Sequence, residues 1–233
     1  MNATGPTMEG EVVAFFDVDH TLIDANPASR YARHALAQGE IGLRAATGTL
    51  WAMATYRLGW TDAAPWIQRA VANLRGMDVE VFRERCEALY AEVMSVHLLE
   101  GAVACVRDHQ RRGERVVLVT ASLHTVVQPL ADHLQVDAVV ANRVCVEGGV
   151  LTGDLVPPIC YGPGKLPLAQ AWAAAHQIDL RDCWFYTDSS SDLALLEAVG
   201  RPVVVHPDPR LERFARLRGW PIREFRASAI GSF

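Results

Sequence analysis

Four short apolar runs, each followed by polar or acidic residues, recur along the chain. They read EVVAFFDV at 11–18, ERVVLVTAS at 114–122, CWFYTDS at 183–189 and PVVVHP at 202–207. Runs of this length, rich in Val and Phe, predict strands that are buried on both faces. Helical patterns lie between them in VVQPLADHL, KLPLAQAWAAAHQ and SDLALLEAVG. This alternation predicts an α/β fold, a doubly wound parallel sheet covered by helices on both sides.

Residues 25–100 break this alternation, because no segment there has a strand pattern. Apolar residues recur there at helical spacing, first Trp66, Ala70 and Leu74 and then Phe82, Cys86, Leu89 and Val93. Asp78 is a candidate helix N-cap, and Gly76 is a candidate turn. We therefore expect a helical cap over 25–100, inserted after the first strand of a core made of 11–24 and 101–233.

Two further features of the sequence concern this cap and the core. Trp51, Trp60 and Trp66 lie in the expected cap, where they either fill its interior or face a ligand. In the core, Val-rich runs flank Gly148 and Gly149 over 138–158, a pattern typical of a β-hairpin.

Composition limits the classes of function. The 233 residues, half of them hydrophobic, are enough to bury a full core. A net charge of −5 and the lack of any run of basic residues argue against nucleic acid as a partner. Residues 1–10 have neither the basic nor the apolar part of a signal peptide, so we expect a flexible lead-in. The least charged long stretch, 45–56, is too short to span a membrane, and we expect a cytoplasmic protein.

The five cysteines, at 86, 105, 145, 160 and 183, are scattered and form no Cys-x-x-Cys or Cys/His cluster. Unpaired cysteines are usually buried. We therefore expect free, mostly buried thiols. The sequence leaves the oligomeric state open.

Polar side chains lie where the predicted strands end. Asp17 and Asp19 end the first strand, and Thr120 and Ser122 end the second. Ligands of open α/β sheets bind beyond the carboxyl ends of the strands, so these side chains are expected to share one site. Two further groups belong to the same prediction: Lys165, after the turn-forming YGPG, and Asp188 and Asp192 in TDSSSD.

The types of these residues indicate a chemistry. Residues two apart converge where a strand gives way to a loop, so Asp17 and Asp19 can flank one substrate atom. Carboxylates this close repel each other unless a cation lies among them, and oxygen ligands suit Mg²⁺, with Asp188 as a second acid ligand. A carboxylate nucleophile, a metal, a lysine and a hydroxyl together indicate attack on phosphorus, with a second acid to move protons.

The four segments resemble, in order, the signature motifs of the haloacid dehalogenase superfamily of phosphatases. DVDHT is similar to its DxDxT motif, and VLVTAS, GK and YTDSSSD are similar to its second, third and fourth motifs. The resemblance covers about 12–210. It implies that Asp17 is the nucleophile, Asp19 the general acid and base, Lys165 the charge-stabilising basic residue and Thr120 a phosphate ligand.

The resemblance also implies a cofactor and further contacts. Mg²⁺ would be held by the Asp17 carboxylate, the Asp19 main-chain carbonyl and Asp188, with Asp192 supporting the metal shell. The substrate would be a small-molecule phosphate monoester. The expected substrate and phosphate contacts are Thr120, Ala121, Ser122, His20 and Asn26.

The place of the helical insertion resembles the phosphoserine-phosphatase-like branch of the superfamily, and two positions depart from that pattern. Thr187 stands where the fourth motif usually has glycine. Asn26, nine residues after Asp17, stands where phosphoserine phosphatases commonly have a glutamate that meets the substrate amine. The second departure argues against phosphoserine as the substrate.

Several alternatives stay open at this point. Ser122 either caps the following helix or contacts phosphate, and Asp192 either caps a helix, serves the metal, or does both. Transfer of the phosphoryl group to another acceptor, as in a mutase, would use the same residues. A catalytically silent binding module is a further alternative. Dehalogenation has no use for a metal or for Asp19, so the second aspartate argues against it.

Overall fold

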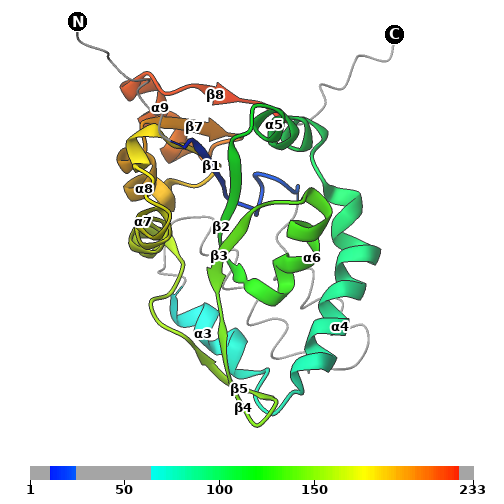
Figure 1. Ribbon diagram of the computed structural model, residues 1–233. Helices are drawn as coiled ribbons and strands as arrows, with labels where there is room; N and C mark the ends of the chain where they lie inside the picture. Colours follow the sequence, from blue (N-terminus) through cyan, green and yellow to red (C-terminus); the bar gives the residue numbers. More distant parts are fainter. Residues whose placement is uncertain (1–10, 25–63, 226–233) are drawn as a thin grey trace, which may run out of the picture.

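A parallel sheet forms the centre of the molecule in the computed structural model, which describes residues 11–24 and 64–225 (Figure 1). Within these residues the main sheet has six strands in the order β3-β2-β1-β6-β7-β8, and all neighbouring strands run parallel. The predicted α/β doubly wound core is confirmed. The strands are β1 (Val13–Phe16), β2 (Arg115–Leu123), β3 (Ala138–Asn142), β6 (Trp184–Thr187), β7 (Arg201–Val205) and β8 (Ile222–Arg223).

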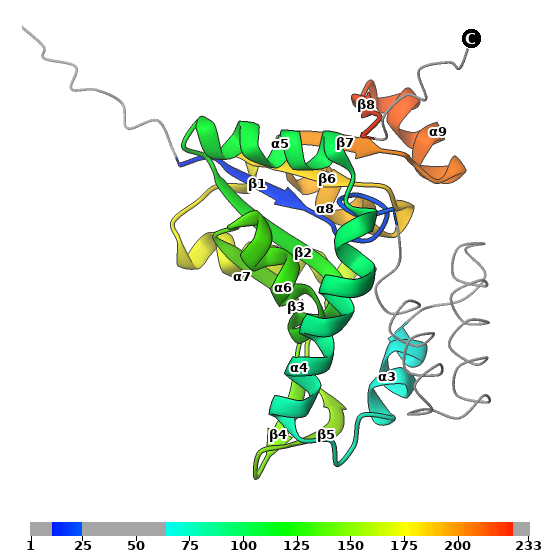
Figure 2. The same cartoon turned by 90° about the vertical axis from the view of Figure 1, so that its right-hand side faces the viewer.

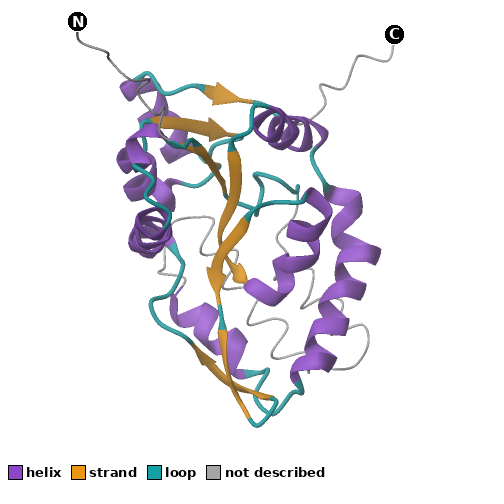
Figure 3. Ribbon diagram, in the orientation of Figure 1, coloured by secondary structure: helices purple, strands orange, loops and turns teal. Residues whose placement is uncertain are grey.

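Helices cover both faces of this sheet (Figure 3). On β1, Phe16 stacks on Tyr186 with ring centroids 4.4 Å apart, whereas Phe15 points to the other face and meets Trp172 edge-on at 5.8 Å. Alternate residues of β1 therefore enter two separate hydrophobic clusters. α5 (Glu100–Arg111) and α6 (His124–Leu134) contribute to the first, and α7 (Lys165–Ala175), α8 (Leu193–Ala198) and α9 (Pro209–Arg218) contribute to the second.

The described part of the predicted cap is helical, as expected. It comprises α3 (Ala64–Ala72), α4 (Val79–Leu89), a π-helical turn (Tyr90–Met94) and a 3₁₀ turn (Ser95–His97). Asp78 caps α4 by accepting hydrogen bonds from the amides of Glu80 and Val81, at 2.8 and 3.2 Å. Gly76 turns the chain with φ of 80°. α4 begins at the lower end of the molecule, near the β4–β5 hairpin (residues 144–155), and runs up toward the sheet (Figure 2).

The boundaries of the cap stay a prediction. Residues 25–63 of the expected cap, Trp51 and Trp60 among them, lie outside the described residues. Trp66 lies in α3.

The segment 138–158 contains the predicted hairpin around Gly148 and Gly149 and, before it, a strand of the main sheet that was not predicted. Residues Ala138–Asn142 are β3, the edge strand of the main sheet, and the antiparallel hairpin consists of β4 (Val144–Glu147) and β5 (Val150–Leu155). Both parts are rich in valine, so their composition does not separate them. The turn falls, as predicted, at Gly148 and Gly149, whose φ values are 57° and 82°.

This hairpin also contacts the α3–α4 link. The Gly76 amide donates to the Leu151 carbonyl at 2.8 Å, and the Val79 amide donates to the Gly149 carbonyl at 3.0 Å. The hairpin therefore joins the core to the described part of the cap.

Two expectations drawn from composition can be compared with the structure. All five cysteines are unpaired; Cys86, Cys105, Cys160 and Cys183 are buried and Cys145 is half-buried, which confirms the prediction. Across residues 11–24 and 64–225, no helix combines the length and the hydropathy needed to span a bilayer.

Candidate active site

The predicted residues meet where β1, β2 and β6 end. The Asp17 amide donates to the Tyr186 carbonyl of β6 at 2.9 Å, which extends the β1–β6 pairing to the first aspartate. From β2, the Ser122 hydroxyl donates to Asp19 Oδ2 at 3.2 Å. These contacts confirm that the carboxyl ends of the parallel strands bring the first, second and fourth motifs together.

Lys165, the first residue of α7, reaches into the same site. Its Nζ lies 3.0 Å from Asp17 Oδ1 and 2.7 Å from Asp192 Oδ2. All three side chains are buried. Burial opposes the lysine charge, but the carboxylates of Asp17 and Asp192 raise the pKa of Lys165 well above its ordinary value. Lys165 is therefore a fixed positive charge beside Asp17.

The two aspartates of the first motif differ in their surroundings. Burial raises the pKa of Asp17 to about 6, although the positive charge of Lys165 lowers it. Burial, with the nearby charge of Asp17, raises the pKa of Asp19 to about 7. Asp19 Oδ1 is buried and has no hydrogen-bond partner among the described residues. A carboxyl group with these properties suits proton transfer near neutral pH.

A bulge at the end of β2 shapes the second motif. Val119 pairs with Val140 and Leu123 pairs with Asn142, so residues 120–122 lie opposite a single residue of β3. Bulges of this kind redirect side chains at the edges of active sites. The Ser122 amide donates to Thr120 Oγ1 at 3.1 Å. Ala121, between these two residues, is half-buried.

The structure excludes one of the two alternatives for Ser122. The N-cap residue of α6 is Leu123, and no side chain caps this helix. Ser122 therefore does not cap α6, and its contact with phosphate stays a prediction. Asp192 holds the N-cap position of α8 without a side-chain cap bond, because its carboxylate faces Lys165 instead.

The acidic groups of the site fit a divalent cation. Burial, then the neighbouring charges of Asp17 and Asp192, raise the pKa of Asp188 well above its usual value. Asp17, Asp19, Asp188 and Asp192 thus share one buried lysine. Among the described residues, no group of three or more acidic, histidine or cysteine side chains is arranged so that it could hold a metal ion. The predicted set has two carboxylates and the Asp19 carbonyl, which are the oxygen donors that Mg²⁺ takes together with water, and it stays a prediction.

The comparison with known families agrees with this geometry. The family model of haloacid dehalogenase-like hydrolases matches residues 14–197. The chain belongs to this family. The resemblance predicted from the four motifs is confirmed.

The relatives of this hydrolase include named phosphatases. It is 31% identical over 225 residues to the phosphoserine phosphatase SerB1 of Mycobacterium tuberculosis, an alignment that covers 95% of this chain and 73% of that protein. It is 34% identical over 217 residues to an inhibition of morphological differentiation protein of Streptomyces azureus, covering 91% and 78%. The phosphatase class expected from the sequence agrees with the first of these names.

Two solved structures share the fold. A protein of unknown function from Bordetella pertussis has a TM-score of 0.84 and 28% identity, covering 93% of this chain and 99% of that chain. A substrate-bound phosphoserine phosphatase has a TM-score of 0.69 and 20% identity, covering 89% and 91%. The second likeness supports the fold alone.

Thr187 of the hydrolase has a defined place despite its departure from the usual glycine. It is fully buried at the end of β6, and its φ lies outside the left-handed region. Its hydroxyl donates to Asp192 Oδ2 at 2.7 Å and accepts from the Ser189 amide at 3.2 Å. Threonine therefore leaves the strand intact and adds a hydrogen bond to the partner of Lys165.

Asp208, which was not predicted as a site residue, holds the loop that carries Asp188. The Asp208 amide donates to the Asp188 carbonyl at 2.9 Å, and Asp208 Oδ2 accepts from the Ser190 amide at 2.6 Å. Its other oxygen caps α9 by accepting from the amides of Arg210 and Leu211. The Asp-Pro pair at 208–209 is a helix-start signal that identifies the cap in the sequence, though not the contact with Ser190.

All of the predicted substrate contacts stay predictions, and two of them lie away from the strand ends described above or outside the described residues. His20 is half-buried in the left-handed region with φ of 55°, and its Nδ1 lies 4.0 Å from Asp24 Oδ1. Asn26 lies outside the described residues.

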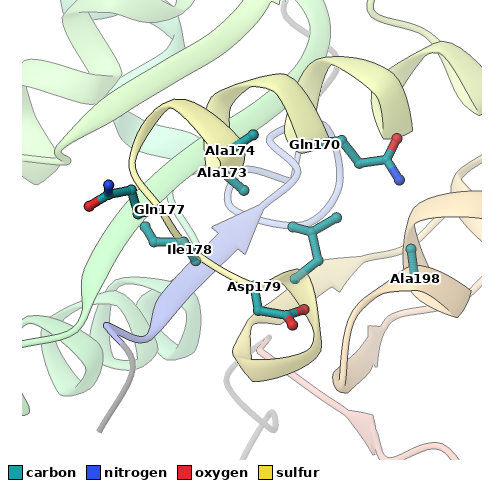
Figure 4. Close-up of a pocket in the computed structure, with 8 residues that line it drawn as sticks. Gln170, Ala173, Ala174, Gln177, Ile178, Asp179 and Ala198 are labelled. Carbon is teal, nitrogen blue, oxygen red and sulfur yellow. The ribbon is translucent and has the colours of Figure 1, made fainter. Parts of the chain in front are cut away.

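A separate pocket of about 530 Å³ lies beside the end of α7 (Figure 4). Gln170, Ala173, Ile178 and Ala198 are among its lining residues. None of the residues predicted for the active site lines it, so it is not part of the site at the strand ends.

Proposed function

We propose that this hydrolase is a Mg²⁺-dependent phosphomonoesterase that cleaves a small-molecule phosphate ester through a phosphoaspartate on Asp17. The observation that carries the proposal is Asp19, a half-buried residue whose carboxyl has a buried, unpaired oxygen and a pKa of about 7, beside the expected nucleophile. Phosphate-ester cleavage needs a group of this kind to protonate the leaving alcohol. Attack on carbon in a dehalogenase does not.

The first half-reaction uses Asp17 and Asp19. Asp17 Oδ1 is engaged by the Val18 amide at 2.8 Å and by Lys165, which leaves Oδ2 to attack phosphorus. The bond from phosphorus to the ester oxygen breaks as the bond to Asp17 forms, and Asp19 gives its proton to the departing alcohol. In the second half-reaction Asp19 takes a proton from water, which attacks phosphorus and releases orthophosphate and Asp17.

The other residues stabilise the charge that spreads over the phosphoryl oxygens. Lys165 supplies a fixed positive charge, and Thr120 and the bulge at 120–122 supply hydroxyl and amide groups. When bound, Mg²⁺ would neutralise part of the same charge. The ion would be held by Asp17, the Asp19 carbonyl and Asp188, and Asp192 would support these ligands without binding the ion itself. Asp192 also orients Lys165 through the 2.7 Å contact.

The substrate is proposed as a small phosphate monoester, in keeping with the phosphatase names among the relatives. Phosphoserine itself is not favoured, because Asn26 replaces the glutamate that commonly meets its amine.

The test is hydrolysis of p-nitrophenyl phosphate by the purified full-length protein. We expect turnover with Mg²⁺, loss of turnover with a chelator and loss in Asp17→Asn, with folding of the variant checked by circular dichroism. Phosphate and alcohol should appear in equal amounts. Metal-independent turnover that survives Asp17→Asn would contradict the mechanism, and an excess of alcohol over phosphate when an acceptor is added would indicate transfer.

A further inference from the structure

Asn142, the last residue of β3, joins two segments that carry different motifs. Its Nδ2 donates to the Ala121 carbonyl at 2.7 Å and to the Cys160 carbonyl at 3.3 Å. Its Oδ1 accepts from the Cys160 amide at 2.8 Å. The residue is only 1% exposed. A buried amide with both its donor and its acceptor used holds its partners in one arrangement.

The contact with Ala121 bears on the phosphate-binding bulge. Ala121 lies inside the bulge, where the register of β2 with β3 is interrupted, and the Asn142 side chain donates to its carbonyl. The carbonyl and the amide hydrogen of one trans peptide group point in opposite directions. Fixing the Ala121 carbonyl therefore fixes the Ser122 amide, which donates to Thr120 Oγ1 at 3.1 Å.

The contact with Cys160 affects the position of Lys165. Between Cys160 and Lys165 the chain makes a tight turn in which the Gly164 amide donates to the Tyr161 carbonyl at 2.9 Å. A Cβ at Gly164 would lie 2.2 Å from the Ile159 carbonyl oxygen, so no larger residue fits this turn. A compact turn transmits the position of its first residues to the residue that follows it. Asn142 thus sets the position of residue 160, the first residue of the stretch 160–165 that leads to Lys165 and is called the lysine segment below.

We propose that Asn142 is a positioning residue that locks the phosphate-binding bulge to the lysine segment, so that Thr120, Ser122 and Lys165 converge on one phosphoryl group. The inference rests on the proposed phosphatase function. Within the described part of the chain, the Asn142 side chain makes its hydrogen bonds to the Ala121 and Cys160 backbones and none to the carboxylates of the site, so it acts through these two backbones. Its loss should weaken phosphate binding and turnover together.

The experiment compares Asn142→Ala with Val140→Ala, a control that removes apolar contacts from the same strand. Val140 is 9% exposed and has no side-chain hydrogen bond. At a temperature where both variants are folded, we expect Asn142→Ala to lower kcat/KM by about 10-fold or more and to raise the inhibition constant of orthophosphate by about 10-fold, because small misplacements of catalytic groups are costly. Val140→Ala should stay within about twofold of the unmodified protein in both constants.

Hydrogen exchange measured by mass spectrometry gives a readout that does not depend on activity. We expect faster exchange in both 118–123 and 159–165 for Asn142→Ala, and in neither segment for Val140→Ala. If Asn142→Ala fails to fold, Asn142→Ser, which loses both amide contacts but offers a hydroxyl for a water-bridged contact, serves for the same measurements.

The outcomes separate the two proposals. Asn142 variants with kinetics and exchange like those of Val140→Ala would overturn the positioning role. If the unmodified protein hydrolyses no phosphate ester, the proposed function fails, and the exchange data still decide whether Asn142 holds the two segments together.

Discussion

The carboxyl group of Asp19 is held where its negative charge is disfavoured. Its pKa of about 7 results from burial and from the charge of Asp17, and its Oδ1 lacks a hydrogen-bond partner among the described residues. Active sites commonly lose stability in this way to gain a reactive group. Removing the charge should therefore stabilise the fold while it removes the proposed proton carrier.

For Asp19→Asn we expect kcat to fall by about 10²-fold or more. We also expect the metal-free variant to be more stable than the unmodified protein, with a difference that grows as the pH rises. Because the folded-state pKa of Asp19 is raised, the folded state binds its proton more tightly than the unfolded chain, whose pKa is near 3.8. The unmodified protein thus loses stability as pH rises from about 4 to about 7. Thermal unfolding with chelator at pH 5 and pH 8 measures the difference.

Asp182→Asn, a change at an exposed aspartate, is the matched control and should show no such dependence. The prediction fails if Asp19→Asn gains no stability relative to the unmodified protein between pH 5 and pH 8.

The hydroxyl of Thr187 supports the partner of Lys165, so its loss should affect both stability and turnover. Thr187→Val keeps the size but removes one of the two donors of Asp192 Oδ2, because only Lys165 Nζ remains, and losing a buried hydrogen bond costs about 1 kcal/mol. We expect kcat/KM to fall by about 10-fold, since Asp192 also orients Lys165. Thr187→Ser retains the hydroxyl and should stay close to the unmodified protein. Urea unfolding and steady-state kinetics test this, and equal behaviour of the two variants would contradict it.

For single residues, the sequence predicts the groups expected to react better than it predicts the residues that hold those groups in place. Asp17, Asp19 and Lys165 were identified from motifs, because the reaction demands those side chains at those spacings. The roles of Thr187 and Asn142 depend on which atoms lie within about 3 Å after folding. No pattern in the sequence encodes that.

Among the elements, the start of α9 and the loop after β6 are linked by one side chain. Asp208 caps the helix with Oδ1 and holds the Ser190 amide with Oδ2. Asp208→Asn should separate these contacts, because asparagine caps helices as well as aspartate does but can offer only one accepting oxygen. We expect an unchanged melting temperature and about 10-fold weaker Mg²⁺ binding by calorimetry, an effect typical of residues behind metal ligands.

Asp208→Ala removes both contacts and should add a loss of about 1 kcal/mol from the missing cap. A Mg²⁺ affinity unchanged in both variants would show that Asp208 serves the helix alone.

The strands and helices were predictable where the hydrophobic pattern is unambiguous. The apolar runs at β1, β2, β6 and β7 predicted those strands, because both faces of a central strand must be buried. β3 was missed as part of the sheet, because it is followed after one residue by a hairpin strand of similar composition. The pairing with β2 is what assigns β3 to the main sheet rather than to the hairpin, and this pairing is a contact between segments that are distant in the sequence.

For the whole molecule, ligand binding and stability are linked. A Mg²⁺–beryllium fluoride complex imitates a phosphorylated aspartate, so it should bind the folded protein at Asp17. At a ligand concentration of about 100 times Kd, it would stabilise the fold by about 2.7 kcal/mol, a rise of about 5–10 °C in Tm for a protein of this size. Differential scanning calorimetry measures the shift.

Asp17→Asn should show no rise in Tm beyond that caused by Mg²⁺ alone. An equal rise in both proteins would place the complex elsewhere. The architecture of the core was predictable at this scale from the order of its strands and helices, whereas the relation of the whole cap to the core depends on packing that sequence patterns do not encode.

The β4–β5 hairpin divides the proposed catalytic groups between two stretches of chain. Asp17, Asp19, Thr120 and Ser122 precede its tip, and Lys165, Asp188 and Asp192 follow it. The tip itself, Gly148 and Gly149, is exposed, and its main chain can be cut without breaking any strand of the central sheet. Two fragments that end and begin there would each be inert and would recover the site only on association, which makes the fold a natural scaffold for a split-enzyme reporter of protein proximity.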